Sequence, residues 1–329
     1  MERYEDHGEN FYYPQEDFLF SLAAKRSWDW NIIRPNGIIG FTPSGLYPFL
    51  LCCLVLTLLI GNGMSMALTL ALYMLCCREM GQPPVFPGNK FFYNSCVEDS
   101  SYAPSIADMS VWAVTTEHAK NEAFNHANGD VFVWKHVWTK IGRHFGIEVG
   151  PRCDELFQPE SIANNYAKVP EFTEWAAKGD ELRMANNFLM TEWSKDKKEV
   201  WASVVAKHGG QLEAYDWGTW DFFDWAVGKA WCTISSVSKA RKFGWQRYDD
   251  TYDTYIEAFQ SFENAGVLPR SDICQTAAEL RKRSALLPHP RDAVLSSPKG
   301  KLENGTYENG VKHNGVPNGF QSSDLAAEM

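Results

Sequence analysis

Apolar and polar residues at the start of the chain follow a helical period and then a strand pattern. Large apolar side chains recur at helical spacing over residues 10–27, with acidic residues in the early turns. Trp28–Arg34 has the composition of a short strand, and a turn signal, Pro35-Asn36-Gly37, follows it. The pattern predicts a helix, a strand and a turn, after which Ile38–Pro43 continues as a loop.

A long uncharged stretch comes next, because no Asp, Glu, Lys or Arg occurs from Pro35 to Cys77. Within it, residues 46–60 and Met64–Cys77 are almost entirely apolar, but each run is shorter than the roughly 20 residues of a membrane-spanning helix. Pro48 interrupts the first run, and glycines separate it from the second. Met64–Cys77 is therefore predicted to be a helix buried in a protein core, and a membrane anchor over residues 46–77 is the alternative.

Strand and helix signals return in the middle of the chain. Glu122–His126 is predicted to be a second short strand, and residues 128–130 open an amphipathic helix, Val131–Phe145, that ends at Gly146. Strands that alternate with helices are typical of an α/β protein. Residues 1–150 are therefore expected to form a Rossmann-like α/β domain.

The remainder is predicted to be mostly helical from 151 to 285 and polar from 286 to 329. The aromatic stretch Trp217–Trp231 is expected to pack in a core, with a wall of an apolar substrate pocket as the alternative. Residues 286–329 contain too few large apolar side chains to offset the entropy cost of ordering them. They are predicted to be a disordered tail.

Composition narrows the function classes. The net charge of −10 argues against a nucleic-acid partner, which requires a basic face. The eight cysteines contain no Cys-x-x-Cys, so we expect reduced, buried thiols rather than a disulfide scaffold or a zinc site. The histidines show no metal-ligand spacing, and no metal is expected. The acidic, polar start of the chain is unlike a signal peptide, and a cytoplasmic location is expected.

General catalytic signatures, including the dinucleotide fingerprint Gly-x-Gly-x-x-Gly and the pair Tyr-x-x-x-Lys, do not occur in the sequence. Three unusual strings do occur in order: residues 10–17 (NFYYPQED), residues 34–43 (RPNGIIGFTP) and residues 121–130 (NEAFNHANGD), the last followed by Trp134-Lys135-His136. Together they resemble the progesterone 5β-reductase/iridoid synthase-like (PRISE) reductases, an atypical branch of the short-chain dehydrogenases. The resemblance covers residues 10–269, and the fungal members are the most similar.

The resemblance implies the C-terminal part of a Rossmann-type, extended short-chain dehydrogenase fold with a mostly helical substrate-side region. It also implies NADP(H) as cofactor and the 1,4-reduction of an activated C=C bond in secondary metabolism, with an apolar enone or enal as substrate and a homodimer as a candidate assembly. In the family, the Gly-rich unit that cradles the pyrophosphate and the catalytic lysine precede the NFYY motif, and this chain begins just before that motif. A truncated remnant without activity, or a binding protein, is therefore a second hypothesis.

Site residues follow from the resemblance position by position. Tyr13 matches the catalytic tyrosine, whose phenol stabilises the enolate oxygen. Pro35, Asn36, Gly37 and Ile38 match the loop on the nicotinamide side of the cofactor site. Residues 45–61 have no counterpart in the family, and we interpret them as an apolar insertion or as unspliced intron sequence.

Overall fold

The computed structural model describes residues 12–42, 65–147, 149, 156–163 and 184–270. Contacts divide the chain into two compact units, Met1–Glu279 and Leu280–Met329, and every described residue belongs to the first. The apolar insertion at 45–61, the first membrane-anchor run at 46–60 and the tail at 286–329 lie outside the described residues. The proposed division between a domain at 1–150 and a helical region at 151–285 stays a prediction.

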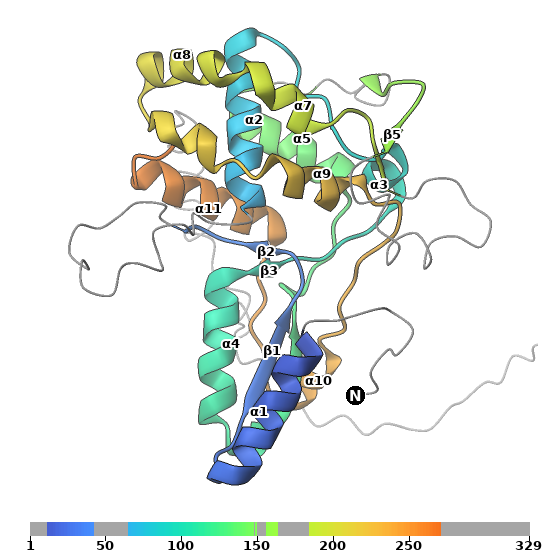
Figure 1. Cartoon of the computed structure of the whole chain (residues 1–329), viewed down its shortest axis with the longest axis vertical. Helices are drawn as coiled ribbons and strands as arrows, with labels where there is room; N and C mark the ends of the chain where they lie inside the picture. Colours follow the sequence, from blue (N-terminus) through green and yellow to red (C-terminus); the bar gives the residue numbers. More distant parts are fainter. Residues whose placement is uncertain (1–11, 43–64, 148, 150–155, 164–183, 271–329) are drawn as a thin grey trace, which may run out of the picture. The chain divides into compact units, whose positions relative to one another are not determined.

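Helices make up most of the described secondary structure (Figure 1). The α-helices are α1 (Tyr12–Arg26), α2 (Met66–Met80), α3 (Lys90–Ser95), α4 (Ala103–Thr115), α5 (Trp134–His144), α7 (Met190–Trp193), α8 (Lys198–His208), α9 (Trp220–Gly228), α10 (Ser238–Lys242) and α11 (Thr251–Asn264). Short 3-10 helices span Glu117–Ala119, Ser194–Asp196 and Leu212–Trp217. The strands are β1 (Asn31–Pro35), β2 (Ile38–Ile39), β3 (Ser101–Tyr102), β4 (Glu122–His126), β5 (Ile162–Ala163) and β6 (Ala185–Asn186).

Two parallel strand pairs form the frame of the α/β part. β1 pairs with β4 from Asn31↔Glu122 to Pro35↔His126, and β2 pairs with β3. The chain between the paired strands β1 and β4 includes α2, α3 and α4, and parallel pairing requires such a crossover connection. In Figure 1, α1 and α4 flank β1. The α/β class with parallel strands is confirmed.

The structure corrects three boundaries. Ile38–Ile39 is a strand rather than part of a loop, because it pairs in parallel with Ser101–Tyr102. α5 begins at Trp134 and not at residue 131, because the backbone of Phe132 is held in an antiparallel bridge to Glu98. β1 begins at Asn31 and not at residue 28, since the side chain of Asn121 accepts the Trp30 N–H.

Helix α2 lies at the centre of the hydrophobic core. Eleven of its fifteen residues are buried, and it contacts α8, α9 and α11. The Ser65 hydroxyl caps its first turn by accepting from Leu68 N at 3.3 Å, and Gly81 ends it with a φ of 65°, which glycine adopts without strain. A helix that is apolar on all sides is expected to be buried, and this prediction is confirmed. In the described part of the chain, no helix has the length and hydropathy needed to cross a membrane.

The cysteine prediction is confirmed for three of the four described thiols. Cys76, Cys77 and Cys96 are buried, and burial raises the pKa of each to about 12, so these thiols are neutral. Cys232 is exposed, and the expectation of burial is wrong for this residue. It follows Trp231 in a segment without helix, where its side chain can reach solvent.

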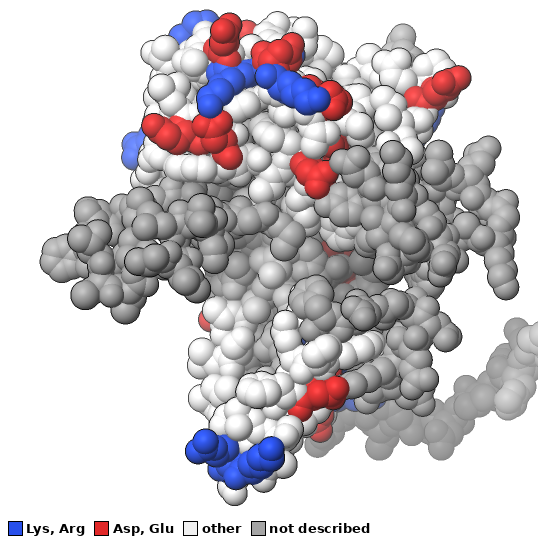
Figure 2. All heavy atoms as spheres, in the orientation of Figure 1, with Lys and Arg blue, Asp and Glu red and all other residues white. Residues whose placement is uncertain are grey.

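The face drawn in Figure 2 carries cationic and anionic side chains next to each other over the end that contains α7 and α8. Two of the ion pairs in this region are Lys195–Glu192 at 2.6 Å and Lys198–Asp216 at 2.7 Å, and all four side chains are more than half exposed. Such exposed pairs contribute at most about 1 kcal/mol each. The fold is therefore stabilised mainly by its apolar core.

A buried carboxylate on α9 connects that helix to α7. The Asp224 side chain accepts hydrogen bonds from Met190 N at 2.6 Å and from the Thr191 amide and hydroxyl at 3.1 and 2.9 Å. Burial raises the pKa of Asp224 to about 6, although these hydrogen bonds act to lower it. Asp224→Ala leaves the Met190 and Thr191 donors without this acceptor, and we expect the free energy of unfolding to fall by about 2–4 kcal/mol. Urea denaturation measures this loss.

Asp221→Ala is the matched control, because Asp221 is an exposed aspartate on the same helix. It is expected to change the free energy of unfolding by less than about 0.5 kcal/mol. Equal losses in the two variants would contradict the capping role of Asp224.

Candidate active site

The predicted cofactor loop, Pro35–Ile38, lies between β1, which pairs with β4, and β2, which pairs with β3. β1 ends at Pro35 and β2 begins at Ile38, so the loop leaves the carboxyl end of one strand and enters the next. In open α/β sheets, ligands bind beyond the carboxyl ends of strands. The structure therefore places all four predicted residues together at an edge where such sheets bind ligands.

Hydrogen bonds from buried residues hold the inner side of this loop. The Asn36 amide donates to Ser101 Oγ at 3.0 Å and to the His126 carbonyl at 3.3 Å. Ser101 is fully buried, and its N–H donates to the Gly37 carbonyl at 2.9 Å. The loop thus has a fixed inner side.

Its outer side is open. Pro35, Gly37 and Ile38 are exposed, with Ile38 at 53% of its full surface. A Cβ added at Gly37 would meet no described atom within 4 Å. With respect to the described residues, a planar ring has room to lie against this backbone, which fits the nicotinamide end of a dinucleotide. Among the described residues, no glycine-rich turn opens a helix where a pyrophosphate could bind in the way the family binds it.

A buried aspartate holds the side chain of the loop asparagine. Asn36 Nδ2 donates to Asp99 Oδ1 and, at 3.3 Å, to the Asp99 carbonyl. Asp99 is 2% exposed, and its second oxygen accepts from Ser235 N at 2.6 Å. Burial raises the pKa of Asp99, while the donors Asn36 and Ser235 oppose this shift by stabilising the carboxylate.

Tyr13 lies in the first turn of α1, and the helix is linked to β1. Glu16 accepts hydrogen bonds from the Arg34 guanidinium, with Arg34 Nε at 3.2 Å. Tyr13 and Glu16 are three residues apart and share a helix face, and Arg34 comes two residues before Asn36. Because Glu16 contacts Arg34 of β1, the face of α1 that Tyr13 shares with Glu16 is directed toward the strand that leads into the loop. Tyr13 is half-buried, whereas its neighbour Tyr12 is 57% exposed. The catalytic role of Tyr13 stays a prediction.

His126 is the last residue of β4, and its carbonyl accepts from the backbone amide of Asn36 in the loop. Its ring is fully buried, with Nε2 3.0 Å from Ser105 Oγ, and its Nδ1 has no hydrogen-bond partner among the described residues. Burial lowers the pKa of His126 from 6.5 to about 4, and an imidazole with so low a pKa is neutral at pH 7.

Acidification is expected to destabilise the fold through His126. Between pH 6.5 and pH 4 the unfolded chain binds a proton that the folded histidine does not bind. The free energy of unfolding therefore falls as the pH drops through this range, by about 1–3 kcal/mol. His126→Asn should remove this part of the pH dependence in urea denaturation. The control variant His118→Asn, at an exposed histidine, should retain this pH dependence. Identical pH profiles for the wild type and His126→Asn would contradict the assignment of this pH dependence to His126.

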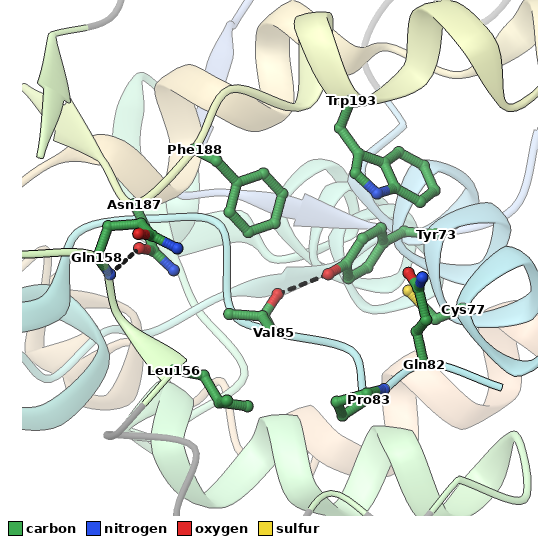
Figure 3. Close-up of a pocket in the computed structure, with 10 residues that line it drawn as sticks. All are labelled: Tyr73, Cys77, Gln82, Pro83, Val85, Leu156, Gln158, Asn187, Phe188 and Trp193. Carbon is green, nitrogen blue, oxygen red and sulfur yellow. Dashed lines mark hydrogen bonds between the residues drawn. The ribbon is translucent and has the colours of Figure 1, made fainter. Parts of the chain in front are cut away.

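The cavity drawn in Figure 3 lies elsewhere, between α2, α7 and the segments beside them. Its volume is about 220 Å³, and Tyr73 closes one side by donating its hydroxyl to the Val85 carbonyl at 2.7 Å. Its lining residues are Tyr73, Cys77, Gln82, Pro83, Val85, Leu156, Gln158, Asn187, Phe188 and Trp193. None of the predicted site residues lines this cavity.

The aromatic stretch 217–231 does not line this cavity either. Phe223 is fully buried in the core, and the Trp220 ring packs 6.0 Å from Trp193 and 5.3 Å from Tyr215. Core packing, the preferred interpretation of the pattern, therefore holds for Phe223, and Trp217 and Trp220 pack against the core while half-buried. Phe222, Trp225 and Trp231 are half-buried outside that cluster.

Sequence patterns did not identify Asp99, Ser101 or His126 as site residues. The polar run Glu98-Asp99-Ser100-Ser101 directly before a helix was the available signal, because a buried polar run needs partners. Its partner, Asn36, is more than 60 residues earlier in the chain, which pattern alone does not show. No group of three or more His, Cys, Asp or Glu side chains that could hold a metal ion occurs in the described part of the chain.

Comparison with known proteins assigns the family. The model of the PRISE-like Rossmann-fold domain matches residues 3–185, which include Tyr13 and the Pro35–Ile38 loop. The chain is 32% identical over 265 residues to a short chain dehydrogenase of Penicillium aethiopicum, covering 80% of this chain and 60% of that protein. It is 30% identical over 263 residues to an (S)-8-oxocitronellyl enol synthase of Nepeta racemosa, covering 79% and 55%. It is 29% identical over 263 residues to the 3-oxo-Delta(4,5)-steroid 5-beta-reductase of Arabidopsis thaliana, again covering 79% and 55%.

The chain thus spans about three fifths or less of the length of each of these relatives. The family model covers more than half of the 329 residues, and the motifs at 10–17, 34–43 and 121–130 fall inside the match. The protein therefore belongs to the PRISE-like Rossmann-fold family.

Proposed function

We propose that the protein is an NADPH-dependent reductase that adds hydride to the C=C bond of an apolar enone or enal. The names of two relatives support this chemistry. One is a 5β-reductase of a 3-oxo-Δ4,5 steroid, in which the C=C bond is conjugated to a carbonyl, and the other forms an enol. Hydride addition to the β-carbon of a conjugated carbonyl yields an enolate, which is the common feature of both descriptions.

Tyr13 is assigned the role of hydrogen-bond donor to the carbonyl oxygen. Negative charge develops on that oxygen as the C=C bond is reduced, and a donor placed there stabilises the transition state more than the substrate. The observation that carries the proposal is the Glu16–Arg34 contact, which joins the helix of Tyr13 to the strand that ends at the predicted cofactor loop.

The exposed backbone of Pro35–Ile38 is assigned to the nicotinamide ring. NADPH, when bound, supplies the hydride. The loop's part is to hold the ring against the carboxyl end of β1, with its own inner side fixed by Ser101 and the His126 carbonyl. The substrate class, the place in secondary metabolism, the homodimer and the cytoplasmic location are part of this proposal.

The second hypothesis is a chain that binds a partner but does not catalyse. A titration of NADPH against the purified full chain, followed by NADPH oxidation with an enone and with the matching saturated ketone, separates the two. Saturable binding and oxidation with the enone alone support the reductase. Absence of saturable binding supports the second hypothesis.

A further inference from the structure

Asn36 is the half-buried residue of the Pro35–Ile38 loop, whose other residues are exposed. Its amide nitrogen donates twice to Asp99, once to the carboxylate and once to the backbone carbonyl. The neighbouring loop residues Gly37 and Ile38 are exposed. The contact with Asp99 is therefore the side-chain anchor of a loop whose outer side is open.

Asp99 has an anchor of its own that does not involve the loop. Its backbone N–H donates to the Thr233 carbonyl at 3.1 Å, and Thr233 N–H donates to the Val97 carbonyl at 3.3 Å, which forms a parallel bridge between Glu98 and Thr233. The carboxylate also accepts from Ser235 N at 2.6 Å. Asp99 is therefore held by contacts that do not depend on the loop.

The next side chain, Glu98, strengthens that anchor. One of its carboxylate oxygens accepts from the Trp134 indole N–H at 2.8 Å, and the other contacts the Lys229 ammonium. Trp134 is 1% exposed and belongs to the hydrophobic core. The segment that carries Asp99 is thus bound to the core through its backbone and through its neighbour.

We infer that Asp99 is a positioning residue whose buried carboxylate fixes Asn36 and thereby the conformation of the Pro35–Ile38 loop. A carboxylate can accept from Asn36 and Ser235 at the same time, one donor on each oxygen, and bonds to a charged acceptor are stronger than bonds between neutral groups. The loop then presents its backbone in one arrangement without rearranging on binding, which favours a bound ring. The role toward nicotinamide rests on the proposed function, but the role in loop geometry does not.

A reversal of the pair provides the test. In Asp99→Asn the amide has one acceptor oxygen for two donors, so either Asn36 Nδ2 or Ser235 N–H faces an NH2 group, and in Asn36→Asp two carboxylates face each other. In the double variant, Asn at 99 can accept from Ser235 through its oxygen and donate to Asp at 36 through its nitrogen. The contact between the two side chains is then restored with its direction reversed, and only the 3.3 Å bond to the Asp99 carbonyl is lost. Asp216→Asn, at an exposed aspartate, is the matched control.

Amide hydrogen exchange of the full chain, read on a peptide spanning residues 31–42, measures the loop without any cofactor. Asp99→Asn is expected to speed exchange in this peptide by about 10-fold, the effect of about one charged hydrogen bond, and leave a peptide from α2 unchanged. The double variant should return to within about 3-fold of the wild type. If Asp99→Asn does not fold, Asn36→Ala tests the same contact, since Asn36 is only half-buried.

Unchanged exchange in the single variants, an equal rise in the α2 peptide, or failure of the double variant to restore protection would overturn the inference. The dissociation constant for NADPH is measured on the same samples and should rise about 10-fold in Asp99→Asn and recover in the double variant. A wild-type chain that does not bind NADPH would refute the proposed function, and the exchange data would still decide whether Asp99 positions the loop.

Discussion

Replacing Tyr13 by phenylalanine is expected to lower kcat for enone reduction by about 10²–10³-fold, the loss typical of removing one donor to a developing oxyanion. The change deletes a single hydroxyl and keeps the ring. The dissociation constant for NADPH should change by less than about 2-fold, because the cofactor contact is assigned to Pro35–Ile38 and not to the tyrosine. Steady-state kinetics and an NADPH titration on the same preparation measure the two effects.

Tyr12→Phe is the matched control for this substitution. Tyr12 is adjacent in the sequence and lies in the same turn of α1, but it is more exposed than Tyr13. It is expected to keep at least about half of the wild-type kcat. Full activity in Tyr13→Phe, or an equal loss in Tyr12→Phe, would show that the tyrosine has been assigned wrongly.

The largest effect on stability is expected from Trp138→Ala. The Trp138 ring is fully buried on α5, its indole N–H donates to the Pro84 carbonyl at 2.8 Å, and it packs 5.0 Å from Phe86 and 6.1 Å from Tyr73. Removing the ring leaves a cavity beside α2 and an unpaired carbonyl. The free energy of unfolding should therefore fall by about 3–5 kcal/mol in urea denaturation.

Trp28→Ala is the control with the same change of side chain. Trp28 precedes β1 and is 45% exposed. Its loss should cost less than about 1 kcal/mol. Comparable losses for the two tryptophans would mean that the Trp138 ring does not pack against Phe86 and Tyr73 as described.

The elements that the sequence pattern predicted correctly are those whose signal lies within their own residues. Met64–Cys77 is apolar at every turn, which is typical of a helix surrounded by protein, and α2 is buried accordingly. Glu122–His126 is bounded by turn residues, and β4 has these limits. The short strands β2 and β3 have only two residues each, and they exist because they pair with each other across more than 60 positions. A pattern within one segment does not contain that partner.

The residues of the candidate site fall into the same two groups, those with a local signal and those that depend on a distant partner. Motif resemblance supplied Tyr13 and the loop residues, since each lies in a contiguous string. The supporting residues Asp99, Ser101 and His126 act through partners far away in the chain, and the structure was needed to find them. The boundary of α5 was misplaced for the same reason, because the bridge between Phe132 and Glu98 competes with the start of the helix.

Transfer of deuterium from NADPH labelled at its transferable C4 position tests the central claim most directly. The purified full chain is incubated with an apolar enone, and the product is examined by NMR and mass spectrometry. The account predicts one deuterium at the β-carbon of a saturated carbonyl product for each NADPH oxidised. Deuterium at the carbonyl carbon of an allylic alcohol, or no product with enzyme and NADPH at equal concentration, would contradict it.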